Sequence, residues 1–299
     1  MFKRDSLTTT KKQYVLFWGV TVFMAMYTFI LVYPFVWAFM ASFMSPLDYQ
    51  AMLQNKLIKL PDVWQFSNYV EAFKGMYVDA FVKGKIMRYN LVAMASNTVT
   101  VALIRTVFST IFPVCASYCC ARYKFFGSKF FFFYGVVFCS IPLYGSASAT
   151  FDLLYKLNLY DTYGAIVLMS ISPFTNFLFY YGFFRSIDKG YSEAAQIDGA
   201  SDFRVFWQIM LPQVIPAIFV FTLNGFVGFW NDWMTTYMYL PSHPTVAHGI
   251  MLLETKATKE NQMPLLFASI FTSLVIPLAF FLTFQKQIMN TVYVGGLKG

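Results

Sequence analysis

The sequence predicts an all-α polytopic membrane protein, because its composition is apolar and its apolar runs are long. Of its 299 residues, 58% are hydrophobic and 12% are charged, and the mean hydropathy is +0.55. Soluble domains carry about a quarter charged residues. A run of roughly 20 apolar residues crosses the hydrocarbon core as a helix. Six such runs predict six transmembrane helices, at approximately 14–43, 97–121, 130–150, 162–184, 214–240 and 265–284.

The runs differ in features that affect their interpretation. The first, at 14–43, is longer than the apolar part of a signal peptide, so it is expected to stay in the membrane. The second contains Arg105, and the third contains Pro142, which membrane helices tolerate where neighbours or water satisfy the freed carbonyl. The fifth carries a polar run at 230–233. The long segment at 44–96 is expected to be ordered and partly helical.

Basic residues predict the orientation of the chain. Lys and Arg collect in short cytoplasmic loops, whereas long loops translocate largely regardless of charge. Basic residues flank the first and last helices and lie in the two short loops assigned to the cytoplasm: Lys3, Arg4, Lys11, Lys12, Arg122, Lys124, Lys129, Arg185, Lys189, Arg204, Lys286 and Lys298. The long outer loop is also basic, but its length makes it uninformative. Both termini are therefore predicted to be cytoplasmic, in a bacterial cytoplasmic membrane.

This topology predicts four segments. They are a cytoplasmic N-terminus at 1–13, a first helix with a long extracytoplasmic loop at 14–96, a core of five helices at 97–284, and a cytoplasmic tail at 285–299. A cytoplasmic loop at 185–212 lies within the core.

Several chemistries have no motif in this sequence. It contains no GxxxxGK[ST] phosphate loop, no HExxH or CxxC pair and no GxSxG elbow. His243 and His248 stand five residues apart with no nearby cysteine, which is a poor metal site. The net charge of +8 is not arranged as a stripe, so nucleic acid is not an expected partner. An enzyme is not expected, and ATP-driven transport would require another subunit to hold the nucleotide.

The predicted cytoplasmic loop contains EAAQIDGASDFRVFWQIMLP, a polar interruption between apolar runs. Helix formers predict a short helix near 191–197, and Asp198-Gly199 predicts its end, since glycine adopts the left-handed cap conformation without steric cost. Ser201 or Asp202 is suited to cap a second helix. The residues Phe203, Phe206, Trp207 and Met210 share one face of that helix by spacing. Spacing alone favours a hairpin that only caps the bundle at the membrane surface.

The same residues carry a resemblance to a known family. Glu193-Ala194-Ala195, Gly199, Ile209 and Leu211-Pro212 match the EAA---G---------I-LP loop of ABC importer permeases, and FFRSI precedes them. The run Trp230-Asn231-Asp232-Trp233 resembles the WND element of the carbohydrate-uptake branch. The ending FQKQIMNTVYVGGLKG resembles its usual GGLKG terminus. The chain is therefore identified as a MalG-like permease subunit with the type I ABC importer fold.

The resemblance implies a role for each part of this EAA loop (residues 185–212). The residues Glu193, Ala194, Ala195, Asp198 and Gly199 would dock a cytoplasmic ATPase, and Leu211 and Pro212 would link the docking surface to the fifth helix. The implied partners are a MalF-like sister permease, two ABC ATPase subunits that use ATP and Mg, and an extracytoplasmic sugar-binding protein. This chain itself would hold no cofactor.

Polar residues within the spans are the candidates for the substrate pathway. Ionisable groups there usually face protein or a water-filled cavity. Arg105 is interpreted either as a structural salt bridge or as a substrate contact. The residues Trp230, Asn231, Asp232 and Trp233 offer the aromatic and polar groups that sugars bind, but could equally anchor the interface and cap a helix break.

Other functions remain as alternatives at this stage. A permease of the same fold for glycerol phosphate or a polyol fits the same motifs. An ion-coupled secondary transporter often has inverted repeats and buried carboxylates, and neither is evident here. A structural or assembly membrane protein would not need the EAA spacing.

Overall fold

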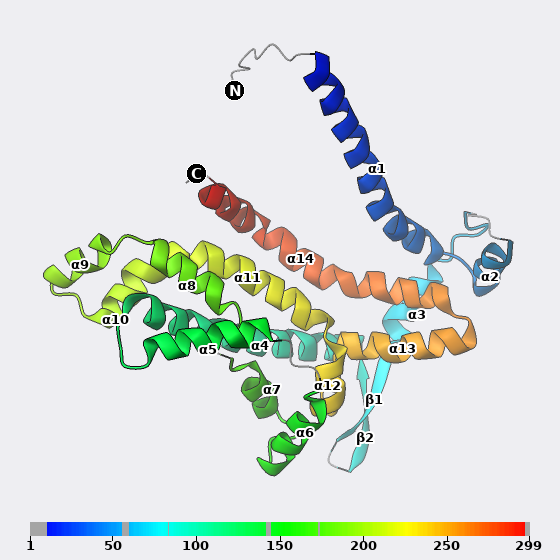
Figure 1. Cartoon of the computed structure of the whole chain (residues 1–299). Coiled ribbons are helices and arrows are strands. Elements are labelled where there is room, and N and C mark those ends of the chain that lie inside the picture. The colour runs from blue at the N-terminus through cyan, green and yellow to red at the C-terminus, as the bar shows by residue number, and fades with distance from the viewer. Residues whose placement is uncertain (1–10, 56–59, 83, 142–144, 173, 297–299) are drawn as a thin grey trace. The chain divides into compact units, whose positions relative to one another are not determined.

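The computed structural model describes residues 11–55, 60–82, 84–141, 145–172 and 174–296, and most of them are helical (Figure 1). The chain divides into two compact units, one made of Met1–Ala72 with Glu254–Thr272 and one made of Phe73–Leu253 with Ser273–Gly299. Parts of the predicted cytoplasmic segments at 1–13 and 285–299 lie outside the described residues. The predicted four-segment division remains a prediction.

The first unit begins with an apolar helix. Its elements are α1 (Lys11–Ala41), α2 (Pro46–Asn55) and most of α3 (Ser67–Gly75). Large apolar side chains of α1, such as Phe17 and Phe29, are exposed, as expected of a helix that is hydrophobic all round and crosses a membrane. Met44, Tyr49 and Met52 form a small core below it. The amide of Asn68 donates to the carbonyls of Ser42 and Met44, at 2.8 and 3.0 Å, and so closes the turn after α1.

The second unit is built around one long helix, α4. Its elements are β1 (Tyr77–Val82), β2 (Lys85–Asn90), α4 (Leu91–Arg122), α5 (Ser128–Ser140), α6 (Ala147–Lys156), α7 (Tyr163–Ser170), α8 (Phe177–Ser186), α9 (Gly190–Ile197), α10 (Asp202–Val205), a π-helical turn (Phe206–Met210), α11 (Leu211–Asn231) and α12 (Trp233–Tyr239). Helix α4 packs against α7, α8 and α11. Two further helices, α13 (Val246–Glu260) and α14 (Met263–Gly296), begin in one unit and end in the other.

Four of the described helices are long and apolar enough to span a membrane. They cover Tyr14–Ala41, Leu91–Arg122, Asp202–Asn231 and Met263–Thr283, so the first, second, fifth and sixth predicted spans each contain a helix of spanning length. The third predicted span is divided between α5 and α6, and its Pro142 lies outside the described residues. The number of six spans stays a prediction.

Two predicted spans differ from single continuous helices. The fourth, at 162–184, is split into α7 and α8, and Asn176 between them adopts a φ of 56°. The sequence places Pro173 at this break, and proline removes a helix hydrogen bond and clashes with the preceding turn. The fifth, at 214–240, breaks at Asp232, which is extended between α11 and α12.

The segment at 44–96 contains a β-hairpin that the all-α prediction did not include. Strands β1 and β2 are antiparallel, with Phe81 opposite Ile86, and Gly84 turns the chain at a φ of 82°. The guanidinium of Arg88 donates to the Asp79 carboxylate at 2.9 and 3.2 Å, and these hydrogen bonds hold the Asp79 pKa below its ordinary value. The alternating pattern YVDAFV favours a strand here.

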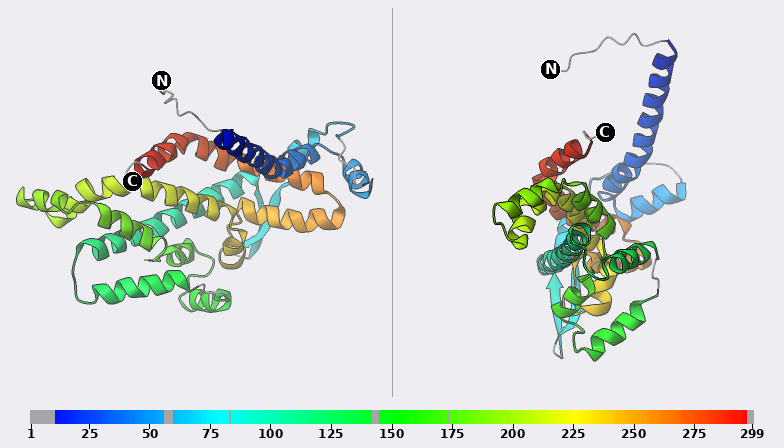
Figure 2. Two further views of the ribbon diagram at one scale, coloured as in Figure 1. Left: turned by 45° about the horizontal axis from the view of Figure 1, so that its top comes forward. Right: turned by 60° about the vertical axis from the view of Figure 1, so that its left-hand side comes forward.

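The β-hairpin and the EAA loop lie at opposite ends of α4 (Figures 1 and 2). Strand β2 runs directly into α4, where the Asn90 side chain accepts from the Ala93 amide and caps the helix. The C-terminal end of α4 lies beside α8 and the EAA loop. At 1.5 Å per residue the 32 residues of α4 extend about 48 Å.

Candidate functional site

The EAA loop forms a helical hairpin whose turn is a glycine cap. Gly199 has a φ of 81°, its amide donates to the Gln196 carbonyl at 3.0 Å, and the Ala200 amide donates to the Ala195 carbonyl at 2.9 Å. This pair of bonds is a Schellman motif, which satisfies the free carbonyls at the end of a helix. The predicted stop at Asp198-Gly199 is confirmed.

Side chains stabilise the two helices that flank this turn. The Asp188 carboxylate accepts from the Gly190 amide at 2.8 Å, at the start of α9. The Ser201 hydroxyl accepts from the Arg204 amide at 3.4 Å and caps α10, as the sequence predicted. The Gln196 amide donates to Asp202 at 3.0 Å and joins the helices directly. The hairpin is therefore held in this shape by hydrogen bonds within the chain.

The proposed docking residues are exposed on this hairpin. Glu193, Ala194, Asp198 and Gly199 are exposed, and no heavy atom lies within 4 Å of a Cβ placed on Gly199. Ala195 is half-buried against the core beneath the hairpin. The structure thus presents one small, open surface and uses Ala195 to fix it to the unit.

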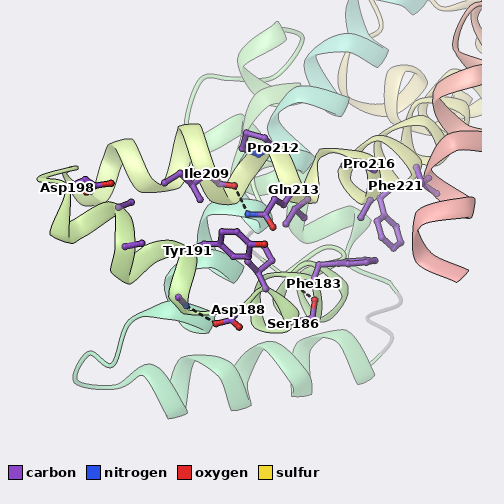
Figure 3. A pocket seen from close by; sticks show the side chains of 17 residues that line it. Phe183, Ser186, Asp188, Tyr191, Asp198, Ile209, Pro212, Gln213, Pro216 and Phe221 are labelled. Atoms are coloured by element: carbon purple, nitrogen blue, oxygen red, sulfur yellow. Dashed lines mark hydrogen bonds between the residues drawn. The ribbon is translucent and has the colours of Figure 1, made fainter. Parts of the chain in front are cut away.

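An open groove of about 1620 Å³ runs between the hairpin and α11 (Figure 3). Ala194, Ala195 and Asp198 line one side, and Pro212 lines the other. Most of the remaining lining is apolar, with Asp188 as a second carboxylate. Leu211 is half-buried against the core, where the hairpin joins α11.

Burial divides the predicted apolar face of the second helix. Phe206 and Met210 are buried, but Phe203 and Trp207 are 72% and 52% exposed. Residues four apart are neighbours on a helix surface, so each pair forms one edge of this face, and only the edge with Phe206 is covered. The helix also contains a π turn, in which the Leu211 amide donates to the carbonyl of Phe206 five residues earlier.

Aromatic packing fastens the hairpin to the rest of the unit. The Tyr118 ring on α4 lies 5.3 Å from Phe184 at the end of α8 and 4.6 Å from Phe206 in the π turn, between ring centroids. All three rings are buried, with Val205 and Met210 beside them. Edge-on and tilted aromatic pairs add stabilisation beyond their buried area. The hairpin is thus part of the packed bundle rather than a free surface loop.

The second group of predicted site residues lies at the other end of α11. Arg105 on α4 donates through Nη1 to Asp232 Oδ2 at 2.5 Å, and its guanidinium lies 4.2 Å from the centre of the Phe229 ring. Asp232 also caps α12, because its carboxylate accepts from the Thr235 amide and hydroxyl at 3.1 and 2.6 Å. Trp230 is 4% exposed and packs in a separate core.

Most of the polar side chains at 230–233 already have hydrogen-bond partners within the chain. The Asn231 amide donates to the Val227 carbonyl at 2.9 Å, and only Asn231 and Trp233 of the four are exposed. The structure therefore supplies the salt bridge and the helix cap that the sequence allowed. A role in the substrate pathway stays a prediction. Sequence reasoning missed Thr235, although its place three residues after Asp232 is the spacing of an N-cap contact.

Comparison with known protein families gives a match over most of the chain. Residues 10–290 match the family described as "Binding-protein-dependent transport system inner membrane component". The chain belongs to this family of membrane transport components, and the resemblance inferred from the EAA motif is confirmed.

Relatives and a solved structure agree with this assignment. The diacetylchitobiose uptake system permease protein NgcG of Streptomyces coelicolor is 28% identical over 90% of this chain and 85% of its own length. The arabinooligosaccharides transport system permease protein AraQ of Halalkalibacterium halodurans is 26% identical over 95% of this chain and 98% of its own length. The galactooligosaccharides transport system permease protein GanQ of Bacillus subtilis is 28% identical over 90% and 91%.

The fold is also that of a solved importer. A chain in the crystal structure of a bacterial ABC transporter involved in the import of the acidic polysaccharide alginate matches with a TM-score of 0.71. The match covers 93% of this chain and 98% of that chain at 20% identity. It confirms the predicted ABC importer permease fold.

Proposed function

We propose that this chain is the permease subunit of an ATP-driven importer for an oligosaccharide, and that the EAA hairpin is its docking site for a separate ATPase. The observation that carries the proposal is an ordered, exposed hairpin that is packed onto α4, α8 and α11. The oligosaccharide assignment is supported by the names of the relatives, which transport diacetylchitobiose, arabinooligosaccharides and galactooligosaccharides.

In this proposal two cytoplasmic ATPase subunits bind ATP and Mg and do all of the hydrolysis. Glu193, Ala194 and Gly199 form the docking surface, and Asp198 lies beside the groove. Leu211 and Pro212 carry its displacement directly into α11. Because the hairpin is internally hydrogen-bonded, force that the ATPase applies at the Gly199 turn displaces the whole hairpin as a rigid unit.

The chain would form half of the translocation pathway. A MalF-like sister permease would supply the other half, and an extracytoplasmic sugar-binding protein would deliver substrate on the opposite side. A solved complex of the alginate ABC transporter contains its periplasmic protein, which supports this last partner. ATP binding would close the ATPases and open the cavity outward, and hydrolysis would reset it. Both termini would lie in the cytoplasm.

Reconstitution tests the proposal. The chain would be co-expressed with a sister permease, an ATPase and a sugar-binding protein from the same organism, purified, and placed in liposomes with ATP inside. Uptake of radiolabelled diacetylchitobiose, arabinotriose, galactobiose and maltotriose would be measured. ATP-dependent uptake of at least one is expected. Uptake that persists without ATP or without the ATPase would contradict the proposal.

Charge reversal at Glu193 tests the docking surface directly. Glu193→Lys is expected to leave folding within about 0.5 kcal/mol, because surface substitutions rarely exceed this, and to abolish co-purification of the ATPase. Glu254→Lys, an exposed glutamate on α13, is the matched control and should retain the ATPase. Normal ATPase binding and uptake by Glu193→Lys would remove this residue from the docking surface.

A further inference from the structure

The last turn of α4 contacts the chain both before and after the EAA hairpin. Arg122 donates through Nη2 to the Ile187 carbonyl at 2.8 Å, and the same nitrogen lies 3.6 Å from the Met210 sulfur. Ile187 leads into α9, and Met210 closes the π turn after α10. One guanidinium therefore lies between the entry and the exit of the hairpin.

Arg122 acts from the same helix face as the aromatic contact already described. Residues four apart on a helix are neighbours on its surface, so Arg122 lies one turn beyond Tyr118. Tyr118 packs on Phe184 in α8, which precedes α9, and on Phe206 in the π turn, which follows α10. Tyr118 through ring packing and Arg122 through hydrogen bonding therefore each contact the chain on both sides of α9 and α10.

The guanidinium of Arg122 has no acidic partner that would hold it elsewhere. Within the described part of the chain it forms no ion pair, and its Nε is buried without a hydrogen-bond partner. A cation at the end of a helix is stabilised by the free carbonyls there. A charge-assisted hydrogen bond is also shorter and stronger than a neutral one, and it fixes direction. Ring packing alone would permit small sliding, whereas this bond sets the position of Ile187.

We propose that Arg122 is a positioning residue that makes the EAA hairpin and α4 move as one body. Through it, displacement of the hairpin by the ATPase passes into α4 as well as into α11. Helix α4 carries this movement past the Arg105–Asp232 ion pair toward the end that bears the β-hairpin. This inference rests on the proposed function, because it assumes an ATPase that moves the hairpin.

A thiol placed at the other end of α4 reports on this movement without a transport substrate. Ser96 is exposed there and directly precedes the predicted span at 97–121, so Ser96→Cys would be introduced into an importer whose other cysteines are replaced by serine. The reconstituted importer would be trapped with ATP and orthovanadate, and the rate at which N-ethylmaleimide labels this thiol would be compared with the untrapped state. Trapping is expected to change the rate in the wild type. In Arg122→Met that change is expected to fall at least roughly fivefold, the lower end of typical coupling between sites.

Control variants separate positioning from folding. Arg185→Met removes a guanidinium at the end of α8 that contacts only Tyr181 among the described residues, so it should behave as wild type. Arg122→Lys keeps a charged donor and should restore most of the response. ATP hydrolysis and ATPase co-purification should be normal in all three variants.

Each outcome decides the matter. A full response in Arg122→Met, or no response of α4 in a wild-type importer that holds its ATPase, overturns the inference. Loss of assembly in both Arg122→Met and Arg122→Lys assigns Arg122 to folding and also overturns it. A wild-type chain that binds no ATPase instead refutes the proposed function on which the inference rests.

Discussion

The two polar interruptions of this apolar chain lie at the two ends of α11 and treat their polar groups in opposite ways. At the start, the EAA hairpin leaves Glu193, Asp198 and Gly199 exposed. At the end, Asp232 is used by Arg105 on α4 and by Thr235 on α12. Both segments contain a helix break that is capped by a side chain or a glycine.

The difference indicates what each interruption is for. Polar groups in a membrane are expensive unless they are satisfied. The segment at 230–233 meets that requirement from within the chain, and it holds α4, α11 and α12 together. The EAA hairpin satisfies its backbone internally but leaves Glu193 and Asp198 exposed. The sequence shows two polar runs, and only the contacts show that one of them is already used within the chain, while the other is exposed as the proposed docking site requires.

The largest predicted effect is at the ion pair between Arg105 and Asp232. Asp232→Ala would leave Arg105 without its counter-ion and α12 without its cap. The two side chains are partly buried, at 17% and 25% exposure, so removing one partner should cost more than the about 1 kcal/mol of an exposed pair and less than the about 3–5 kcal/mol of a fully buried one. We expect a marked fall in the thermal stability of the purified chain, measured by tryptophan fluorescence in detergent.

A double variant sharpens this prediction. Arg105→Met with Asp232→Ala removes the unpaired charge and should recover part of the lost stability. Equal stability of Asp232→Ala and the wild type would show that the pair is not structural, and would favour the prediction that Arg105 and Asp232 belong to the substrate pathway.

A smaller effect is predicted at the hairpin turn. Gly199→Val places a β-branched residue at a φ of 81°, where L-residues pay roughly 1–2 kcal/mol. The turn is expected to distort, so ATPase co-purification should fall although the bundle stays folded. Gly182→Val is the control, because Gly182 lies within α8 without a positive φ and a Cβ there meets nothing within 4 Å. Unchanged co-purification in Gly199→Val would separate the turn from docking.

The smallest predicted effect is a pH dependence of stability that arises at His248 on α13. His248 is buried against the Tyr237 ring of α12, at 5.2 Å between centroids, and burial lowers its pKa from the ordinary 6.5. The unfolded chain therefore takes up a proton before the folded chain does. Stability is full above pH 6.5 and falls as the pH drops from there toward the folded pKa. This loss of stability between pH 7.5 and 5 should be absent in His248→Phe, as measured by thermal unfolding at each pH.

Local chemistry was predictable where it depended on a few adjacent residues. The end of α9 at Gly199, the cap at Ser201 and four of the six apolar spans each follow from neighbours in the sequence, and the structure has a cap or a helix of spanning length at each. The exposure of Phe203 and Trp207 was not predictable, because spacing places them on one face with Phe206 and Met210 and only the packing around Tyr118 decides which edge of that face is covered. The break between α7 and α8 was missed because an apolar composition outweighed the signal of Pro173.

By itself the sequence determined the membrane class, the helical hairpin and the family, since hydropathy, turn chemistry and motif spacing are properties of short stretches. Only the tertiary structure decided which polar groups are already used. Arg105 and Asp232 are 127 residues apart in the chain, and Arg122 reaches Ile187 across 65 residues. Such pairings arise only when the helices pack together, so patterns within a short stretch of sequence do not predict them.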